Sequence, residues 1–384
     1  MKDKRHLIVV DPTAFGGGSK VATESILALL DKRQVRITVL TADKHSWKGD
    51  QILGMDLTRV HLYEPKWLAE KEQGLSYFAR HIFIAFNLLL VSLRFGRFDI
   101  ALGASGPGVD LSLYLLRPIM HYKIIQLIHG PVAKSRTIAR CLKIAHQVFY
   151  LQTSYISLKN ALATLQWTKE SLPTHFHLFQ NGLSKKQWPT PCQTQKACFF
   201  WAASLLKWKG LDVFLAALNT MPLAKRCPSH ICYIKPQGVQ LPVTNAPVRL
   251  AKVNWHNTPN NLDQLRANSN IFISTSKHEP FGLSILEAMA AGHSIIIPAD
   301  GAYWDQVLID NINCIKYIPG DSQDLSNKLL KLSTNLSLIK HLGKQAKLVA
   351  QDYQAEKQYA QIVNQLKFNL GLHNASTDLA RSVI

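Results

Sequence analysis

The stretch HEPFGLSILEAMAAG, residues 278–292, decides how this chain folds. Pro280 disfavours helical backbone at the residue before it, so a loop is expected at the start of the stretch. Apolar residues then recur at helical spacing, and Gly292 supplies a natural stop. The pattern predicts a short helix that begins at Leu283 or Ser284.

Apolar segments typical of strands lie on both sides of this stretch, at 270–275 before it and at 294–298 after it. A strand, a loop with a glycine and a helix N-terminus, in that order, present free amides and the positive end of a helix dipole, which suits a phosphate group. A purely structural interpretation also stands, because Ser284 and Glu287 have the spacing of a capping box and Pro-Phe-Gly is an ordinary turn. These residues alone do not decide between the two.

The segment EPFGLSILE, preceded by an apolar strand and followed by AMAAG, resembles the Glu-x7-Glu signature of retaining glycosyltransferases of family 4, in the GT-B superfamily. The resemblance involves nine or more neighbouring positions. It covers nearly the whole chain, is strongest over 197–332 and is loosest over 45–95. It implies a GT-B fold, with two facing Rossmann-like domains, parallel sheets and a cleft between the domains.

The composition agrees with a globular protein of more than one domain. The chain has 384 residues, of which 47% are hydrophobic, enough for two buried cores. The net charge of +19 is spread along the chain, since residues 1–183 hold 23 Lys and Arg against 13 Asp and Glu. No RNA-binding aromatic motif or arginine-rich tract accompanies the charge, so nucleic acid is not expected as a partner. The six cysteines have no zinc-site spacing and are expected to be reduced.

The chain is expected to be cytoplasmic. Its first residues lack the apolar core of a signal peptide, and the longest later apolar run, 82–93, is too short to span a bilayer. However, the apolar, aromatic and basic stretch from Lys66 to Phe98 suits docking at the inner face of the cytoplasmic membrane, where cations meet anionic lipid. The alternative is that residues 82–93 form a buried helix.

Strands and helices are predicted to alternate in both halves, and apolar runs without alternation indicate parallel sheets covered on both faces, a doubly wound α/β architecture. The predicted strands, besides the two flanking the opening stretch, are 7–10, 35–40, 100–103, 123–128, 147–151, 175–179, 197–203, 231–234, 248–253 and 314–318. Thr258 and Pro259 are predicted to cap a helix over 260–267. The predicted organisation is an N-terminal domain over 1–183, a linker over 184–196, a C-terminal domain over 197–355, a C-terminal helix over 356–371 that could cross back to the N-terminal domain, and a tail over 372–384.

Two signals in the N-terminal half point to a ligand. Gly17 and Gly18 lie in a glycine-rich loop after the first strand, where open α/β sheets bind ligands, although a turn of this kind is unspecific. His129 stands where a buried strand ends. A lone histidine is more often structural, but in the family a histidine at the corresponding place approaches the donor sugar and pyrophosphate.

The resemblance assigns a donor site to the C-terminal half. Lys209 matches the family lysine that binds the donor pyrophosphate, and an ammonium suits a departing diphosphate. The family usually has an arginine five residues earlier, where this chain has Ser204. Lys207 either replaces that arginine or is a solvated surface lysine. Gly301-Ala302-Tyr303-Trp304-Asp305 also departs from the family's Gly-Gly-x-Pro-Glu pattern.

By the same resemblance, Glu287 accepts hydrogen bonds from the nucleotide ribose, Glu279 lies near the sugar ring, and amides near Gly282 and Leu283 cap the phosphates. The expected catalytic residues are Glu279, His129 and Lys209. The expected donor-binding residues are Glu287, Phe281, Gly282, Leu283, Ser204, Lys207, Gly17 and Gly18. No metal and no cofactor are expected, because the sequence has no Asp-x-Asp and the family generally needs no divalent metal.

The implied function is transfer of a sugar from a nucleotide-diphosphate sugar, such as a UDP- or GDP-sugar, to a glycan or lipid-linked glycan acceptor. The resemblance implies retention of the anomeric configuration and a place in cell-surface polysaccharide or lipopolysaccharide synthesis. A different class of function stays open, namely a catalytically impaired GT-B protein that acts as a basic binding or scaffold module.

Overall fold

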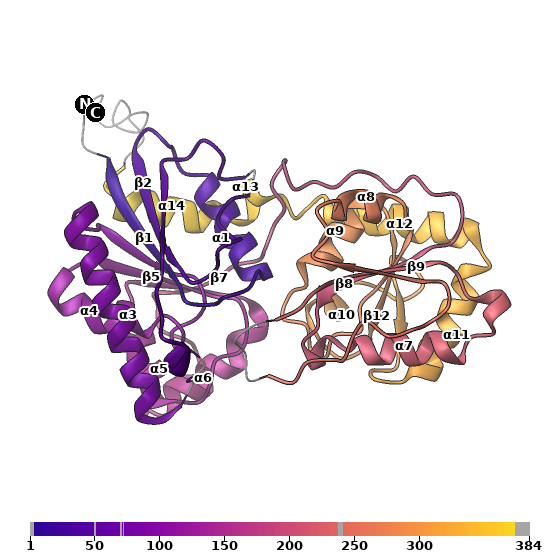
Figure 1. The fold of residues 1–384 in the computed structure, drawn as a ribbon, viewed down its shortest axis with the longest axis horizontal. Coiled ribbons are helices and arrows are strands. Elements are labelled where there is room, and N and C mark those ends of the chain that lie inside the picture. The colour runs from indigo at the N-terminus through magenta and orange to yellow at the C-terminus, as the bar shows by residue number, and fades with distance from the viewer. Residues whose placement is uncertain (1–3, 50, 70, 72, 237–240, 373–384) are drawn as a thin grey trace. The chain divides into compact units, whose positions relative to one another are not determined.

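The computed structural model describes residues 4–49, 51–69, 71, 73–236 and 241–372, and the chain within it divides into two compact units (Figure 1). The first unit contains Ser19–Phe179, together with the start of the chain up to Ala14 and the end of the chain from Gln358. The second contains Phe15–Gly18 and Gln180–Lys357. The predicted tail lies, after its first residue, outside the described residues.

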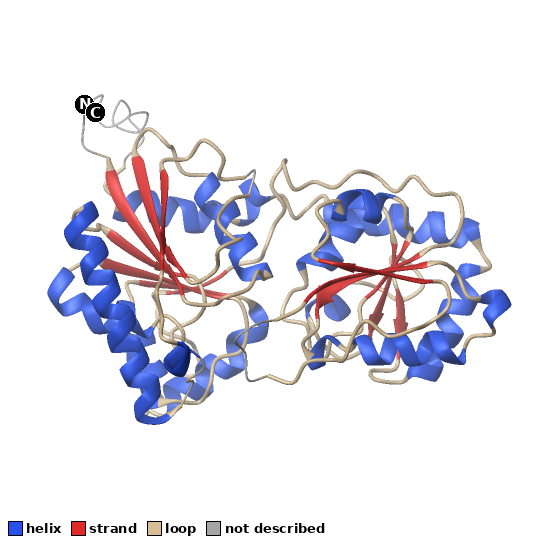
Figure 2. Cartoon of the chain, in the orientation of Figure 1, coloured by secondary structure: helices blue, strands red, loops and turns tan. Residues whose placement is uncertain are grey.

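The first unit is built on a seven-stranded parallel sheet in the order β3-β2-β1-β4-β5-β6-β7. Its strands are β1 (Arg5–Asp11), β2 (Val35–Thr41), β3 (Leu57–His61), β4 (Ile100–Gly103), β5 (Lys123–Ile128), β6 (Gln147–Tyr150) and β7 (Phe176–Leu178). The central strands are buried along almost their whole length because helices cover both faces of the sheet, as Figure 2 shows.

The helices of the first unit are α1 (Gly18–Ala28), α2 (Lys66–Ala69), α3 (Gly74–Phe95), α4 (Leu111–Met120), α5 (Arg136–Ile144), α6 (Tyr155–Ala163) and α14 (Ala360–Asn369), with a 3₁₀ turn η1 (Gln152–Ser154). The sequence runs back into this unit at its end, because α14 groups with the first unit.

The second unit has a six-stranded parallel sheet in the order β10-β9-β8-β11-β12-β13. Its strands are β8 (Phe199–Ser204), β9 (Ser229–Ile234), β10 (Val253–Asn257), β11 (Ile271–Ile273), β12 (Ser294–Pro298) and β13 (Ile315–Tyr317). Its helices are α7 (Leu211–Thr220), α8 (Leu262–Ala267), α9 (Leu283–Ala291), α10 (Tyr303–Val307), α11 (Ser322–Ser333), α12 (Leu336–Ala350) and α13 (Ala355–Gln358), with 3₁₀ turns η2 (Lys207–Lys209) and η3 (Leu223–Lys225).

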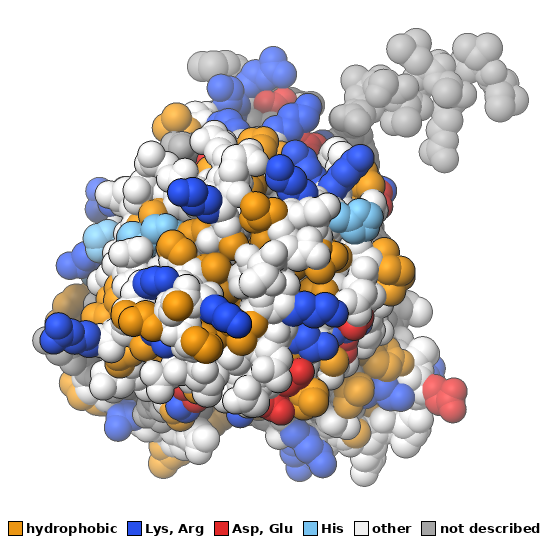
Figure 3. Space-filling view, turned by 90° about the vertical axis from the view of Figure 1, so that its right-hand side faces the viewer, with side chains coloured by type: hydrophobic (Ala, Val, Ile, Leu, Met, Phe, Trp, Pro, Cys, Tyr) orange, Lys and Arg blue, Asp and Glu red, His pale blue; other side chains and the backbone are white. Residues whose placement is uncertain are grey.

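This architecture confirms the predicted fold class, two Rossmann-like domains with parallel sheets. All predicted strands except one occur within two residues of their expected bounds. The exception is 248–253, because the strand of this region, β10, begins at Val253 and runs to Asn257. The charge is spread as expected, and the face drawn in Figure 3 carries Lys and Arg side chains scattered among apolar and neutral ones.

The prediction that Thr258 and Pro259 begin a helix is wrong. Helix α8 begins at Leu262, and its N-cap is Asn261, whose side chain makes no capping bond. Thr258 has a positive φ of 46° and lies in the turn after β10. The Ser/Thr-Pro pattern is common to turns and helix starts, so it placed the start of the helix two residues too early, while the end at Ala267 was predicted correctly.

Candidate active site

Two loops of the second unit meet at the point where its strand order reverses. Strands β8 and β11 are neighbours in the sheet, and the chain leaves them in opposite directions across it, to β9 on one side and to β12 on the other. Open α/β sheets bind ligands at the carboxyl ends of the strands at such a switch point. The loop after β8 carries Lys209, and the loop after β11 carries Glu279.

These loops bring two of the predicted catalytic residues together. Lys209 Nζ lies 2.5 Å from Glu279 Oε2 and 4.0 Å from the centre of the Trp208 ring. The Lys209 and Glu279 side chains are 17% and 14% exposed, so the pair is shielded from bulk water without being closed off from it. The Lys209 ammonium therefore stands beside a carboxylate and over an aromatic face.

Gly210 fixes the distance between the two loops. Its φ is 69°, and a Cβ at this position would lie 2.1 Å from the Thr275 carbonyl oxygen, so only glycine allows this approach. The loops are also hydrogen-bonded, because the Lys277 N–H donates to the Trp208 carbonyl (2.8 Å) and Thr275 Oγ1 donates to the Lys209 carbonyl (3.0 Å). The position of Lys209 therefore depends on the glycine that follows it.

The helix after the Glu279 loop begins without a side-chain cap. The N-cap of α9 is Gly282, which has φ 76°, and no side chain caps it, so the capping-box interpretation of Ser284 and Glu287 is wrong. The first helical hydrogen bonds run from the Ile285 and Leu286 amides to the Gly282 carbonyl. The amides of the first turn, which include Leu283, precede these bonds and face the helix end, as an anion site requires.

Glu287 has an ion-pair partner that the sequence did not reveal. Arg266 Nη2 donates to Glu287 Oε2 at 2.6 Å, and Arg266 Nη1 donates to Asp263 Oδ1 at 2.9 Å. The Arg266 side chain is 6% exposed, whereas that of Glu287 is 21% exposed. The buried Arg266 side chain therefore fixes the position of the more exposed Glu287 carboxylate. An arginine on a short helix gives no sequence signal for this role.

The Phe281 side chain is not accessible to a ligand. It is 2% exposed and packs against Tyr303, Trp304 and Tyr353, at ring-centre distances of 4.9, 5.1 and 6.1 Å. The Tyr303 and Tyr353 hydroxyls are hydrogen-bonded at 2.9 Å. Because this aromatic cluster covers the ring, any donor contact at Phe281 comes from its backbone. Trp304, which stands where the family pattern has proline, is one of the residues that depart from that pattern, and here it belongs to the cluster.

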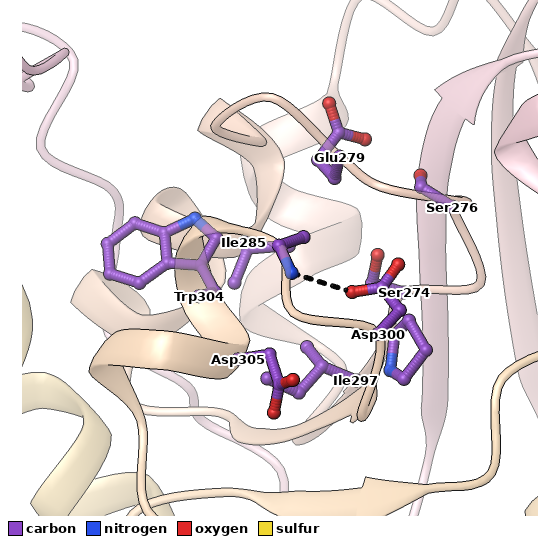
Figure 4. A pocket seen from close by; sticks show the side chains of 10 residues that line it. Ser274, Ser276, Glu279, Ile285, Ile297, Asp300, Trp304 and Asp305 are labelled. Carbon is purple, nitrogen blue, oxygen red and sulfur yellow. Dashed lines mark hydrogen bonds between the residues drawn. The ribbon is translucent and has the colours of Figure 1, made fainter. Parts of the chain in front are cut away.

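A small cavity of about 10 Å³, room for roughly one water molecule, lies under the Glu279 loop (Figure 4). Asp300, whose side chain is 6% exposed, closes one side of it and accepts the His278 N–H (2.7 Å) and the Ala302 N–H (3.0 Å). In Figure 4 the Glu279 carboxylate points away from Asp300 and Asp305. Asp300 therefore shapes the loop, while the Glu279 carboxylate pairs with Lys209.

The remaining predicted residues of the second unit differ in their surroundings. Ser204 is the last residue of β8 and is half-buried. Lys207 pairs with Asp212 at 2.9 Å, and the two side chains are 55% and 44% exposed. This is the geometry expected if Lys207 is a solvated surface lysine. Gly17 and Gly18 belong to the segment that groups with the second unit, and a Cβ at Gly18 would lie 3.5 Å from Leu283 Cδ1.

His129 lies in the first unit, directly after β5. Both of its ring nitrogens are buried and have no hydrogen-bond partner among the described residues, and its ring centre is 5.5 Å from that of Phe179. Burial lowers the pKa of His129 to about 4, so the ring is neutral at pH 7. An unpartnered buried imidazole is uncommon, because a polar group usually regains its lost hydration through a hydrogen bond.

The described residues contain no group of three or more His, Cys, Asp or Glu side chains that could hold a metal ion. The six cysteines, all of them described, are free thiols. One described helix, α3, is long and apolar enough to cross a membrane by length and composition.

The comparisons with known proteins agree with this geometry. Residues 184–349 match the family model "Glycosyl transferases group 1". This segment contains the Lys209 loop, the Glu279 loop and α9. No curated protein sequence matches the chain.

Solved structures show the same fold over almost the whole chain. HepE from Anabaena, in complex with UDP-glucose, is similar with a TM-score of 0.70 and 15% identity, over 94% of this chain and 99% of that one. A sucrose-phosphate synthase from Thermosynechococcus elongatus has a TM-score of 0.68 and 15% identity, over 96% and 99%. WaaG, a glycosyltransferase involved in lipopolysaccharide biosynthesis, has a TM-score of 0.60 and 14% identity, over 93% and 98%. The fold is thus that of GT-B glycosyltransferases.

Proposed function

We propose that this protein is a glycosyltransferase that moves a sugar from a nucleotide-diphosphate sugar to a glycan acceptor, with retention of the anomeric configuration and without a divalent metal. The observation that carries the proposal is the Lys209–Glu279 pair beside the uncapped N-terminus of α9, at the switch point of a parallel sheet. The family match over 184–349 supports the same chemistry.

In this proposal Lys209 and the first turn of α9 bind the diphosphate. Negative charge builds up on the diphosphate as the bond to the sugar breaks, and a fixed ammonium and a helix N-terminus stabilise that charge. A bound diphosphate competes with Glu279 for the Lys209 ammonium. The carboxylate released in this way can accept hydrogen bonds from sugar hydroxyls, so donor binding itself prepares Glu279 for the sugar.

Glu287 is proposed to bind the nucleotide ribose. A carboxylate can accept from two hydroxyls at once, and its ion pair with buried Arg266 fixes it before the nucleotide arrives. We assign to His129 a contact with the sugar or the diphosphate, since its ring is neutral, buried and unpartnered. Uridine nucleotides are the first to test, because HepE is solved with UDP-glucose.

The donor assignment is tested by calorimetric titration with UDP and GDP. Lys209→Ala and Glu287→Gln are each expected to weaken binding by about tenfold or more, which is the loss of one charged or bidentate contact. Lys207→Ala is the matched control, a lysine of the same 3₁₀ turn whose ion pair with Asp212 is on the surface. Equal affinity of all three variants and the unchanged protein would refute the assignment.

The stereochemistry and metal independence rest on the Glu-x7-Glu resemblance and on the absence of Asp-x-Asp from the sequence. Proton NMR of the first product formed from an α-linked donor should show an α linkage. Full activity in the presence of a chelator is expected. A β-linked product, or activity that a chelator abolishes and manganese restores, would contradict these two points.

The acceptor is proposed to be a growing cell-surface glycan, free or lipid-linked, extended in the cytoplasm. This step has the support of WaaG, a protein of similar fold that is involved in lipopolysaccharide biosynthesis.

A catalytically impaired binding module is the second candidate. It is favoured by Ser204, which has no cationic side chain, and by Lys207, which pairs with Asp212 instead of replacing the missing arginine. Nucleotide binding without transfer or hydrolysis of any sugar nucleotide would select this candidate. Turnover of even one sugar nucleotide, abolished by Lys209→Ala, would reject it.

A further inference from the structure

Helix α3 has an apolar face that the first unit leaves uncovered. Six large side chains on this helix are 41% to 89% exposed: Leu75, Phe78, Ile82, Phe86, Leu90 and Leu93. Monomeric soluble proteins rarely expose apolar side chains in a continuous row, and such rows mark a surface that meets another apolar phase or a partner.

The exposed residues form one stripe along the helix. At about 100° per residue they fall, together with Ala79 and Leu89, within an arc of roughly 120° that contains no polar residue. The opposite side of α3 packs into the unit through residues such as Ile84 and Leu88, both fully buried. We call the residues of this arc, 75, 78, 79, 82, 86, 89, 90 and 93, the α3 stripe; of these, Leu89 is partly buried against the core.

The two helices that contact α3 also expose apolar and aromatic side chains. Helix α4 packs against α3 and exposes Leu115 (40%) and Ile119 (67%). Helix α2 contacts α3. Trp67 on α2 is 71% exposed, and Tyr63, which precedes α2, is 66% exposed. Trp and Tyr are the residues that favour the boundary between a bilayer and water.

The helix itself and the turn that follows it carry charge of one sign only. The segment 74–98 contains no Asp or Glu, and Arg94 and Arg97 lie exposed at the end of the helix. Arg80 is different, because its guanidinium pairs with the Glu64 carboxylate. A row of apolar side chains that ends in two exposed arginines is complementary to a surface with an apolar interior and anionic headgroups.

We propose that the α3 stripe docks this protein on a membrane that contains anionic lipid, with α3 (Figure 1) lying in the plane of the interface. The helix is long and apolar enough to span a bilayer, and only 22% of its most apolar window is buried. Spanning would, however, pull Ile84 and Leu88 out of the core that the first unit needs. Interfacial docking keeps the buried face in place and covers only the stripe.

This inference deepens the proposed function, because an enzyme held at the membrane meets a lipid-linked acceptor there. Binding to vesicles is nevertheless measured without a donor or an acceptor. A protein that binds vesicles and transfers no sugar would refute the proposed function alone, and a protein that transfers sugar and ignores vesicles would refute this inference alone.

The test is co-sedimentation of the full chain with vesicles of phosphatidylcholine containing about 30 mol% phosphatidylglycerol, and with phosphatidylcholine alone. The double variant Ile82→Asp/Phe86→Asp places two carboxylates in the middle of the stripe. The matched control, Ile156→Asp/Phe368→Asp, changes two side chains of the same unit that are 72% and 65% exposed and lie outside the stripe.

The unchanged protein and the control should sediment with the anionic vesicles, and the stripe variant should bind about tenfold or more weakly, because two charges must enter the interface. Arg94→Gln/Arg97→Gln should reduce the dependence of binding on salt. Circular dichroism checks that all variants are folded. Absence of vesicle binding, or equal binding by the stripe variant, would overturn the proposal. So would a lipid-free dimer, seen by sedimentation velocity, that the stripe variant dissociates, because a second copy would then cover the face.

Discussion

At the scale of single residues, the geometry of the candidate site depends on a glycine as well as on its charged pair. Gly210 allows the Lys209 turn to touch the backbone of Thr275, and this contact places Lys209 beside Glu279. We expect Gly210→Ala to destabilise the protein by about 2 to 4 kcal/mol, the sum of a left-handed alanine and a steric overlap with a carbonyl. The affinity for the nucleotide should fall with it.

Gly301→Ala is the matched control for this prediction. Gly301 has a φ of 76°, close to that of Gly210, but a Cβ there would meet nothing within 4 Å. Gly301→Ala should therefore lower the free energy of unfolding only by the cost of a left-handed alanine backbone, about 1 kcal/mol, and leave the affinity for the nucleotide unchanged. Urea unfolding and calorimetric titration give both quantities. Equal losses in the two variants would show that the contact with Thr275 has no part in building the site.

A second residue-scale expectation concerns Asp110, which is fully buried in the first unit after β4. It accepts the Ser105 N–H (3.0 Å) and Gln126 Nε2–H (2.8 Å), and burial raises its pKa to about 7, with Asp11 adding to the rise. A carboxyl whose pKa is higher in the folded than in the unfolded chain binds its proton more tightly when folded. Its contribution to the free energy of unfolding therefore decreases as the pH rises from about 4 to 7.

Asp110→Asn removes this titration and keeps the size of the side chain. The difference in free energy of unfolding between Asp110→Asn and the unchanged protein should move in favour of asparagine when the pH is raised from 5 to 8. Urea unfolding at both values measures the shift. A difference independent of pH would mean that Asp110 is ionised throughout this range.

The sequence named most residues of the candidate site but not their partners. Lys209 and Glu279 could be identified because each belongs to a dense local pattern. Arg266 could not, since its partner Glu287 is 21 residues away and the pair is created by the packing of α8 beside α9. The burial of Phe281 escaped for a similar reason, because Tyr303 and Tyr353 reach it from distant segments.

At the scale of elements, the N-terminus of α9 distinguishes a binding site from a capped helix. Because Gly282 is the N-cap and no side chain caps the helix, Ser284→Ala should change the free energy of unfolding by a few tenths of a kcal/mol at most. Helix α11 supplies the control, since Asp321 accepts the amides of Gln323 (2.8 Å) and Asp324 (3.0 Å). Asp321→Ala should cost about 1 kcal/mol. A similar loss for Ser284→Ala would restore the capping-box interpretation.

Elements were predictable from sequence where burial decides them. Strands such as β5 and β12 are buried along almost their whole length, because helices cover both faces, and their bounds were predicted to the residue. Edge strands carry a weaker signal. β3 was not predicted and β10 was misplaced, and both have half-buried or exposed residues throughout. Helix α3 extends beyond the predicted run 82–93 at both ends, and its outer face is exposed.

At the scale of the whole molecule, the two parallel sheets follow from the alternation of buried strands and helices, which any reader of the sequence can see. The assignment of short segments to one unit or the other does not follow from this alternation. Phe15–Gly18 groups with the second unit although the residues on both sides belong to the first, and no local pattern encodes such an exchange. A test at this scale observes both units at once.

Hydrogen exchange measured by mass spectrometry on the whole chain provides such a test. A nucleoside diphosphate alone should slow exchange in the second unit, around 207–210 and 279–287, because its phosphates and ribose are proposed to bind there. The matching sugar nucleotide should in addition slow exchange around His129 in the first unit, since this buried and unpartnered imidazole is proposed to contact the donor. His129→Ala should abolish only the second effect. Protection around His129 by the diphosphate and the sugar nucleotide alike would assign the histidine to the phosphates, and protection by neither would remove it from the site.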